Sequence, residues 1–374
     1  MFDPGRLPEL QHLVREATRG DASLLEEVLN QVASLRPVMT IAPRNTNSVS
    51  LVASDGGNNR LEFNPFSLMV VRVVDTYGVE QFLDVISPYT DTEALGRRHL
   101  DQRTPLGTMM RELGAASLAD LSPMISRQRK SSGWPLAYRE LCEWAVLYDL
   151  VCHSTWGSDT LVIRDGLLRT KVFAADRFAA LYRNLRSAVE RSRRERRRDI
   201  FLVGIAKHSR VIERYRLAMA IAGTLPAGQP CHVAVPAELQ HKVYDRRPEY
   251  VQSPGDDQDG AGPPAFNMGA MHLVRFGRLA ADPVWTVDLL RCQAQRAAEI
   301  LGCLVSDAEQ GFPVACYPQS LQRADRHAQV VDLDLAFLQG ALERAVREQV
   351  PAARRPVFDA QLLQAADPAA VRYQ

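Results

Sequence analysis

The sequence predicts a mixed α/β fold, on three observations. Short apolar runs of strand length alternate with longer stretches of helical periodicity, so both kinds of element are expected. After an N-terminal helix, strand-like runs come first and the longer helices follow, which favours a mixed central sheet flanked by helices. No repeat of about 20–50 residues is evident, which argues against a solenoid or a propeller.

The N-terminal part, 5–36, carries apolar residues at helical spacing (Leu7, Leu10, Leu13, and again from Leu24) and predicts a helical arm. Strands are expected at 48–54 and 67–75, around a Gly- and Asn-rich turn that is typical of a hairpin or meander. Further strands are expected at TLVIR (160–164), IFLVGIA (200–206), MHLVRFG (271–277) and PVWTVDL (283–289). RTKVF (169–173) is expected to pair with TLVIR across Asp-Gly-Leu-Leu.

Helices are expected between these strands. Pro135 stands near the start of a helix from Trp134 to about Val151, where its missing N–H is tolerated. The segment 245–268 is rich in Pro, Gly and Asp and predicts a mobile loop. Residues 90–132 are expected to mix short helices with loops, and other helices are expected at 175–197, 209–222, 288–302 and from 317 onward.

Composition excludes several classes of protein. The 374 residues contain no apolar run long enough to span a membrane, and the N-terminus lacks the features of a signal peptide, so a cytoplasmic location is the default expectation. The six cysteines form no C-x-x-C pair, which argues against a zinc ribbon or a disulfide scaffold. There is also no P-loop, no G-x-G-x-x-G and no H-E-x-x-H motif.

Two aspartates follow similar apolar runs. LVASDGG (51–57) and LVIRDGL (161–167) each end on Asp-Gly, at Asp55 and Asp165. A single Asp-Gly after a strand is usually a turn. If the two strands are neighbours in one sheet, however, their ends bring two carboxylates together, and such a pair needs a cation. Oxygen ligands of this kind suit Mg²⁺.

The helix from Trp134 offers two more carboxylates, Glu140 and Glu143. Each shares a helix face with apolar residues, so periodicity alone does not choose between them, and a surface position is the ordinary alternative for both. Lys207 follows the buried strand 200–206 in VGIAKHSR and is one of only four lysines in the chain. It either caps the strand or offsets charge on a phosphate. In YPQSLQRAD (317–325), Tyr317 is a loop anchor or a site residue, and Asp325 a helix-face charge or a ligand.

The charge distribution is less informative. The formal net charge is +1, which does not indicate a nucleic-acid binder by itself. RSRRERRRD (191–199) places six arginines in nine residues. Such a run is usually a solvated helix end, and phosphate contact is the alternative.

Taken in order, these motifs resemble the NurA nuclease family: Asp-Gly after a first strand, a helical glutamate, a second strand ending in Asp-Gly, Gly-x-x-Lys, and Tyr-Pro-x-x-Leu-x-x-Ala-Asp. The resemblance covers roughly residues 48–335. It implies an RNase H-like nuclease domain at 46–345, after a helical arm at 1–45 and before a C-terminal tail at 346–374. Some family members carry histidine where this chain has Asp325, and His327 lies two residues later.

The resemblance also implies a function. Asp55, Glu143, Asp165 and Asp325 would bind Mn²⁺ or Mg²⁺, and Lys207 and Tyr317 would complete the catalytic set. The activity would be a single-strand endonuclease and 5′→3′ exonuclease on DNA. The chain would form a homodimer and act with a HerA/FtsK-like hexameric ATPase in DNA end resection, repair or phage defence. One alternative is an inactive DNA-encircling scaffold that docks and regulates the ATPase, and another is a small-molecule phosphohydrolase.

Overall fold

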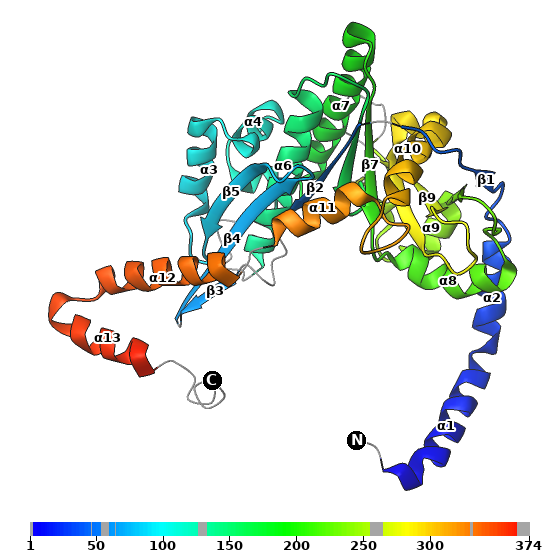
Figure 1. Ribbon diagram of the computed structural model, residues 1–374, viewed down its shortest axis with the longest axis horizontal. Coiled ribbons are helices and arrows are strands. Elements are labelled where there is room, and N and C mark those ends of the chain that lie inside the picture. Colours follow the sequence, from blue (N-terminus) through cyan, green and yellow to red (C-terminus); the bar gives the residue numbers. More distant parts are fainter. Residues whose placement is uncertain are drawn as a thin grey trace.

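Ten strands form one mixed sheet in the computed structural model (Figure 1). The structure describes residues 3–45, 47–53, 60–63, 65–125, 133–254, 265–329 and 332–364. The strand order is β1-β8-β9-β10-β7-β6-β2-β4-β3, and β5 pairs with β4. The strands are β1 (Met39–Thr40), β2 (Asn47–Ala53), β3 (Arg60–Phe63), β4 (Phe66–Asp75), β5 (Glu80–Ile86), β6 (Thr160–Asp165), β7 (Ile200–Ala206), β8 (Cys231–Ala234), β9 (Gly269–Arg275) and β10 (Val284–Leu290).

Five of these strands have the topology of an RNase H-like core, in the order β5-β4-β2-β6-β7. β2, β4 and β5 form an antiparallel meander, while β6 runs parallel to β2 and β7 runs parallel to β6. Parallel neighbours need a crossover. Here α6 (Trp134–Cys152) precedes β6, and α7 (Ala175–Arg191) joins β6 to β7. The predicted α/β class, with a mixed central sheet flanked by helices, is therefore confirmed.

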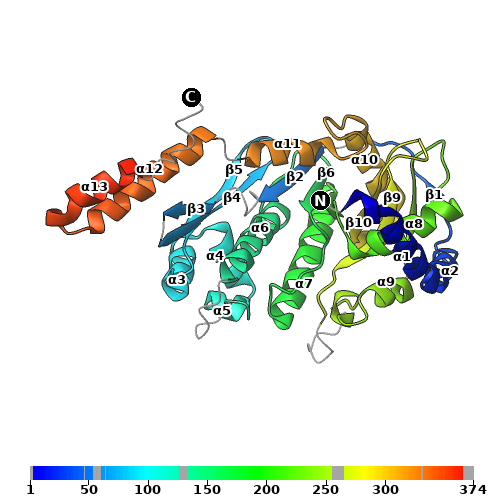
Figure 2. The same ribbon diagram turned by 90° about the horizontal axis from the view of Figure 1, so that it is seen from below.

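Helices cover both faces of the sheet (Figure 2). One face packs against α6, α7, α3 (Thr92–Gln102), α4 (Pro105–Glu112) and α5 (Leu118–Leu121). Farther along this face lie α2 (Ala22–Val32), α8 (Arg210–Ala222) and α9 (Ala237–Val243). The opposite face packs against α10 (Ala297–Glu309) and α11 (Gln319–Ala328). Strands β6 and β7 have helices on both sides, which explains why they read as continuous apolar runs.

Helices at both ends of the chain extend away from the sheet (Figure 1). The N-terminal arm consists of α1 (Leu7–Gly20), none of whose residues is buried, and α2, which packs on α8. At the other end, α12 (Asp332–Gln349) packs against β3 and is followed by α13 (Arg355–Gln364).

The expectation for RTKVF was wrong. Residues 169–173 form no strand with β6, and the only bridge recorded for this segment within the described chain joins Arg169 to Asn267. Both sides of β6 are already occupied, because β6 lies between β2 and β7. Strands β1, β3, β5 and β8 were not anticipated.

All six cysteines lie within the described residues, and none of them is in a disulfide. None of the helices in the described ranges is both long and apolar enough to cross a bilayer.

Candidate active site

The candidate site lies at the sheet edge where β2, β6 and β7 end. Asp165 is the last residue of β6 and lies opposite Ile205 of β7. Lys207 follows Ile205 by two residues, just after the end of β7. On the other side of β6, Leu51 of β2 lies opposite Arg164. The two strands that lead to Asp-Gly are therefore neighbours in one sheet, which is the condition that the sequence set for bringing their carboxylates together. Asp55 itself lies outside the described residues.

Glycines permit the tight turn after Asp165. Gly166 has a φ of +111°, and its N–H donates to the carbonyl of Ile205 at 2.7 Å, which keeps the start of the loop against β7. A Cβ on Gly204 of β7 would lie 2.4 Å from the Gly166 carbonyl oxygen. The close contact between the loop and β7 therefore requires glycine at position 204.

Lys207 joins two carboxylates from distant parts of the sequence. Its Nζ donates to Asp165 Oδ2 at 3.2 Å and to Asp325 Oδ2 at 2.7 Å. Asp325 comes from α11, which packs against β2 and β4 (Figure 1). Asp165 and Asp325 are partly buried, and Lys207 is more exposed than either. The structure thus brings together three of the residues that the sequence suggested.

The electrostatics of the group reflect burial and charge compensation. Burial raises the pKa of Asp165, and the neighbouring Asp325 raises it further against the opposing effect of Lys207. Burial alone would lower the pKa of Lys207, but the two carboxylates outweigh this and raise it. Lys207 is therefore held in its charged form, and Asp165 carries a charge for which one ammonium group does not fully compensate.

Tyr317 contributes an unsatisfied hydroxyl beside this group. The residue is 2% exposed, and within the described residues its OH has no hydrogen-bond partner. Its ring packs on Trp285 with centroids 4.6 Å apart, and Lys207 Nζ lies 5.8 Å from its centroid. Burial raises the pKa of Tyr317, and so do the charges of Asp165 and Asp325. A buried donor without a partner is costly, and it marks a place where a ligand or a water fits.

Glu143 reaches the same edge from α6, but through arginines. Its carboxylate lies 3.4 Å from Arg164 Nη2 and 3.8 Å from Arg139 Nε. Burial raises the pKa of Glu143 to about 7, and the arginines oppose this shift. Glu140 also contacts Arg164, at 3.6 Å, but its side chain is 35% exposed against 20% for Glu143. Both glutamates remain candidates, and Glu143 is the more strongly desolvated.

Arg164 is a site residue that sequence reasoning missed. It is buried, lies over the Trp144 ring at 4.6 Å and donates to the Leu167 carbonyl at 2.9 Å. It thus connects the β6 strand, the loop after Asp165 and the two glutamates of α6. A charged residue inside the apolar run TLVIRD was the available signal.

A divalent cation fits part of this set. The carboxylates of Asp165 and Asp325 supply the oxygen ligands that Mg²⁺ and Mn²⁺ prefer, and the Tyr317 hydroxyl is a nearby donor for water or phosphate. Within the described ranges, no group of three or more His, Cys, Asp or Glu residues is placed to hold a metal ion. A cation here would meet two carboxylates among the described residues, while Glu143 is engaged by arginine.

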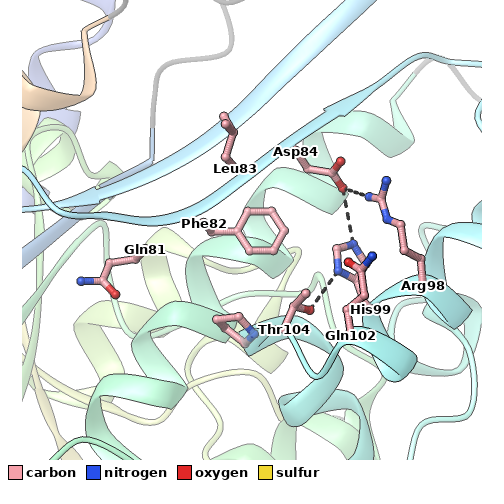
Figure 3. Close-up of a pocket in the computed structure, with 9 residues that line it drawn as sticks. Gln81, Phe82, Leu83, Asp84, Arg98, His99, Gln102 and Thr104 are labelled. Carbon is pink, nitrogen blue, oxygen red and sulfur yellow. Dashed lines mark hydrogen bonds and ion pairs between the residues drawn. The ribbon is translucent and has the colours of Figure 1, made fainter.

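A second polar cluster fixes the first half of α6. Asp84 of β5 accepts hydrogen bonds from Tyr138 of α6, at 2.5 Å, and from Arg98 of α3. His99 contacts Asp84 and Thr104 beside a cavity of about 330 Å³ (Figure 3). Burial alone would raise the pKa of Asp84, but the bonds from His99, Tyr138 and Arg98 hold it at about 2. The cluster anchors α6 five residues before Glu143.

Among known proteins, a solved structure is similar to this chain. No model of a protein family matches the chain, and no curated protein matches it. The crystal structure of the NurA nuclease from Sulfolobus solfataricus is similar, with a TM-score of 0.42 and 12% identity, over 94% of this chain and 99% of that chain.

Proposed function

We propose that this chain is a divalent-metal-dependent nuclease, a phosphodiester hydrolase acting on DNA. One observation carries the proposal: Asp165 and Asp325, far apart in the sequence, meet at Lys207 where parallel strands end. Two carboxylates gathered at such an edge suit hydrolysis of a phosphate ester, and so does the nearby buried hydroxyl of Tyr317, which no described residue satisfies.

Each residue has a role in this proposal. Asp165 and Asp325 would hold the cation, with Asp55 and Glu143 as the other ligands that the sequence suggests. The cation would activate water and stabilise the leaving oxygen. Lys207 would offset charge on the attacked phosphate, and the Tyr317 hydroxyl would donate a hydrogen bond to a phosphate oxygen.

The finer parts of the proposal follow the family resemblance. They are single-strand endonuclease and 5′→3′ exonuclease activity, Mn²⁺ or Mg²⁺ as the cofactor, a homodimer, a cytoplasmic location, and a HerA/FtsK-like hexameric ATPase as the partner in end resection, repair or phage defence. The arginine-rich end of α7, which continues as a helical turn over Ser192–Arg196, is largely exposed and compatible with a nucleic-acid substrate.

The test compares wild type with Asp165→Asn on labelled single- and double-stranded oligonucleotides, with Mn²⁺, Mg²⁺ or EDTA. We expect cleavage only with metal, and a loss of at least about a hundredfold in Asp165→Asn. The matched control is Asp101→Asn, which changes an exposed carboxylate on α3 and should leave cleavage intact. Cleavage that persists in EDTA or in Asp165→Asn contradicts the proposal.

Two other results would favour the alternatives. Hydrolysis of mononucleotides without cleavage of oligonucleotides indicates a small-molecule phosphohydrolase. Binding of DNA with neither cleavage nor carboxylate-dependent metal binding indicates the inactive scaffold.

A further inference from the structure

We propose that the Lys207 ammonium is the internal counter-ion of the metal-free site, and that a divalent cation binds only by displacing it. This inference rests on the proposed function, because it concerns the same carboxylates. It assigns to Lys207 a role that precedes any contact with a phosphate: it competes with the metal for Asp165 and Asp325.

The geometry places the ammonium where a cation would be bound. One nitrogen atom contacts an oxygen of each carboxylate, at 3.2 and 2.7 Å. Within the described residues, every ion pair recorded for Asp165 and for Asp325 is with Lys207. Two ionised carboxylates at close range repel each other, and a lysine ammonium, a compact point charge, offsets this repulsion. A divalent ion on the same oxygens would be repelled by the ammonium unless Lys207 moved.

The surroundings give Lys207 room to move. Its side chain is 40% exposed, and it lies after the end of β7, just before Ser209 caps α8. Its departure therefore breaks no backbone hydrogen bond of the sheet. Arg164 differs, because it is buried and pairs with both glutamates and the Leu167 carbonyl. The site thus contains one positively charged side chain that can move, Lys207, and one that is held in place, Arg164.

The alternative is a structural lysine that positions the carboxylates for the metal. The two roles predict opposite effects of removing the charge. If Lys207 competes, a neutral side chain of similar length raises metal affinity. If Lys207 only positions Asp165 and Asp325, its loss lets the carboxylates separate, and metal affinity falls.

Isothermal titration of the full chain with Mn²⁺ separates these roles. We expect Lys207→Met to bind Mn²⁺ about tenfold more tightly than wild type, and the matched variant Lys207→Arg, which keeps the charge, to bind no more tightly than wild type. Equal or weaker binding by Lys207→Met overturns the inference. Asp165→Asn is the second control. If wild type binds Mn²⁺ no better than Asp165→Asn does, the proposed metal site itself has failed, and with it the proposed function.

A second measurement follows metal binding in the wild-type protein and needs a variant only to assign the Lys207 signal. Lysines can be labelled with ¹³C-methyl groups that keep their charge, and the chain has only four, at 130, 171, 207 and 242. The signal missing from Lys207→Arg, or from Lys207→Gln if that variant folds better, assigns Lys207. We expect Mg²⁺ to shift the Lys207 signal saturably and to leave those of Lys171 and Lys242 in place. A Lys207 signal that stays fixed while Mg²⁺ binds overturns the inference.

Discussion

At the scale of single residues, the site is characterised by incompletely compensated charge. Asp165 and Glu143 both have raised pKa values because they are desolvated, even though Lys207 and Arg164 lie beside them. Tyr317 adds a buried donor that has no partner within the described residues. Polar groups left in this state cost stability in the absence of a ligand, and such clusters are typical of functional sites.

The raised pKa of Glu143 predicts a pH dependence. In the cation-free protein Glu143 holds its proton up to about pH 7, and a protonated acid is a poor metal ligand. Mn²⁺ affinity should therefore increase as the pH rises through 7, with proton release on binding, measured by calorimetry in buffers of different ionisation enthalpy. In Glu143→Gln the Mn²⁺ affinity should not increase as the pH rises through 7. The same steep rise in that variant would show that another group is responsible.

The same shift has a consequence for stability. Because the folded-state pKa of Glu143 lies above its ordinary value of 4.5, the folded state binds the proton more tightly than the unfolded state does. The contribution of Glu143 to the free energy of unfolding is therefore fully present below about pH 4.5 and is lost as the pH rises through 7.

Tyr317→Phe tests the unsatisfied hydroxyl. Removing a buried donor without a partner should leave the free energy of unfolding unchanged or raise it by up to about 1 kcal/mol. DNA cleavage should fall about a hundredfold, because a donor to the phosphate is lost. Urea unfolding and cleavage rates are the two measurements. Undiminished cleavage would remove Tyr317 from the catalytic set.

At the scale of elements, the loop after β6 is held by a buried ion pair. Asp288 of β10 is completely buried and accepts from Arg169 Nε at 2.9 Å, from Arg169 Nη2 at 2.6 Å and from the Leu168 N–H at 3.1 Å. Arg169 Nη1 donates to Gln240 and to the Tyr250 carbonyl, each at 3.0 Å. This loop begins directly after Asp165, so the pair fixes the direction in which the chain leaves the site.

Arg169→Met should lower the free energy of unfolding by about 3–5 kcal/mol, because it leaves the Asp288 carboxylate buried without its charge partner. Urea denaturation measures this change. The matched control is Arg194→Met on the exposed end of α7, where the change should stay within about 0.5 kcal/mol. A similar small change in Arg169→Met would mean that Asp288 is protonated or otherwise satisfied in the folded protein.

The elements that the sequence predicted best are those with the strongest patterns. The strand expected at 200–206 coincides with β7, and the one at 160–164 with β6 apart from its last residue. By contrast, the sequence of β5 does not follow its burial, because Asp84 is buried whereas Leu83 and Val85 are exposed. Its apolar and polar residues therefore do not alternate as they do in a recognisable half-buried strand. Arg169 was misassigned because its apolar neighbours look like a strand, whereas Asp288, distant in sequence, holds it in a loop.

At the scale of the whole molecule, the order of strands in the sheet determines which residues meet at the site. β6 lies between β2 and β7 in the sheet, although long segments separate the three strands in the sequence. The parallel direction of the three strands brings the ends of β6 and β7, and the residues that follow them, to one edge. α11 packs on β2 and β4 and brings Asp325 to Lys207, and Tyr317, which precedes this helix, lies beside the same lysine.

The sequence by itself determined the α/β class, the main strands, and the positions at which Asp165 and Lys207 follow buried strands. These depend on periodicity and turn chemistry, which act over a few residues. Only the tertiary structure decided that Lys207 contacts both Asp165 and Asp325, that Arg164 engages Glu143, and that the Tyr317 hydroxyl is buried without a partner among the described residues. Such contacts depend on the order of strands and the packing of helices, and local patterns do not specify the distance between two elements.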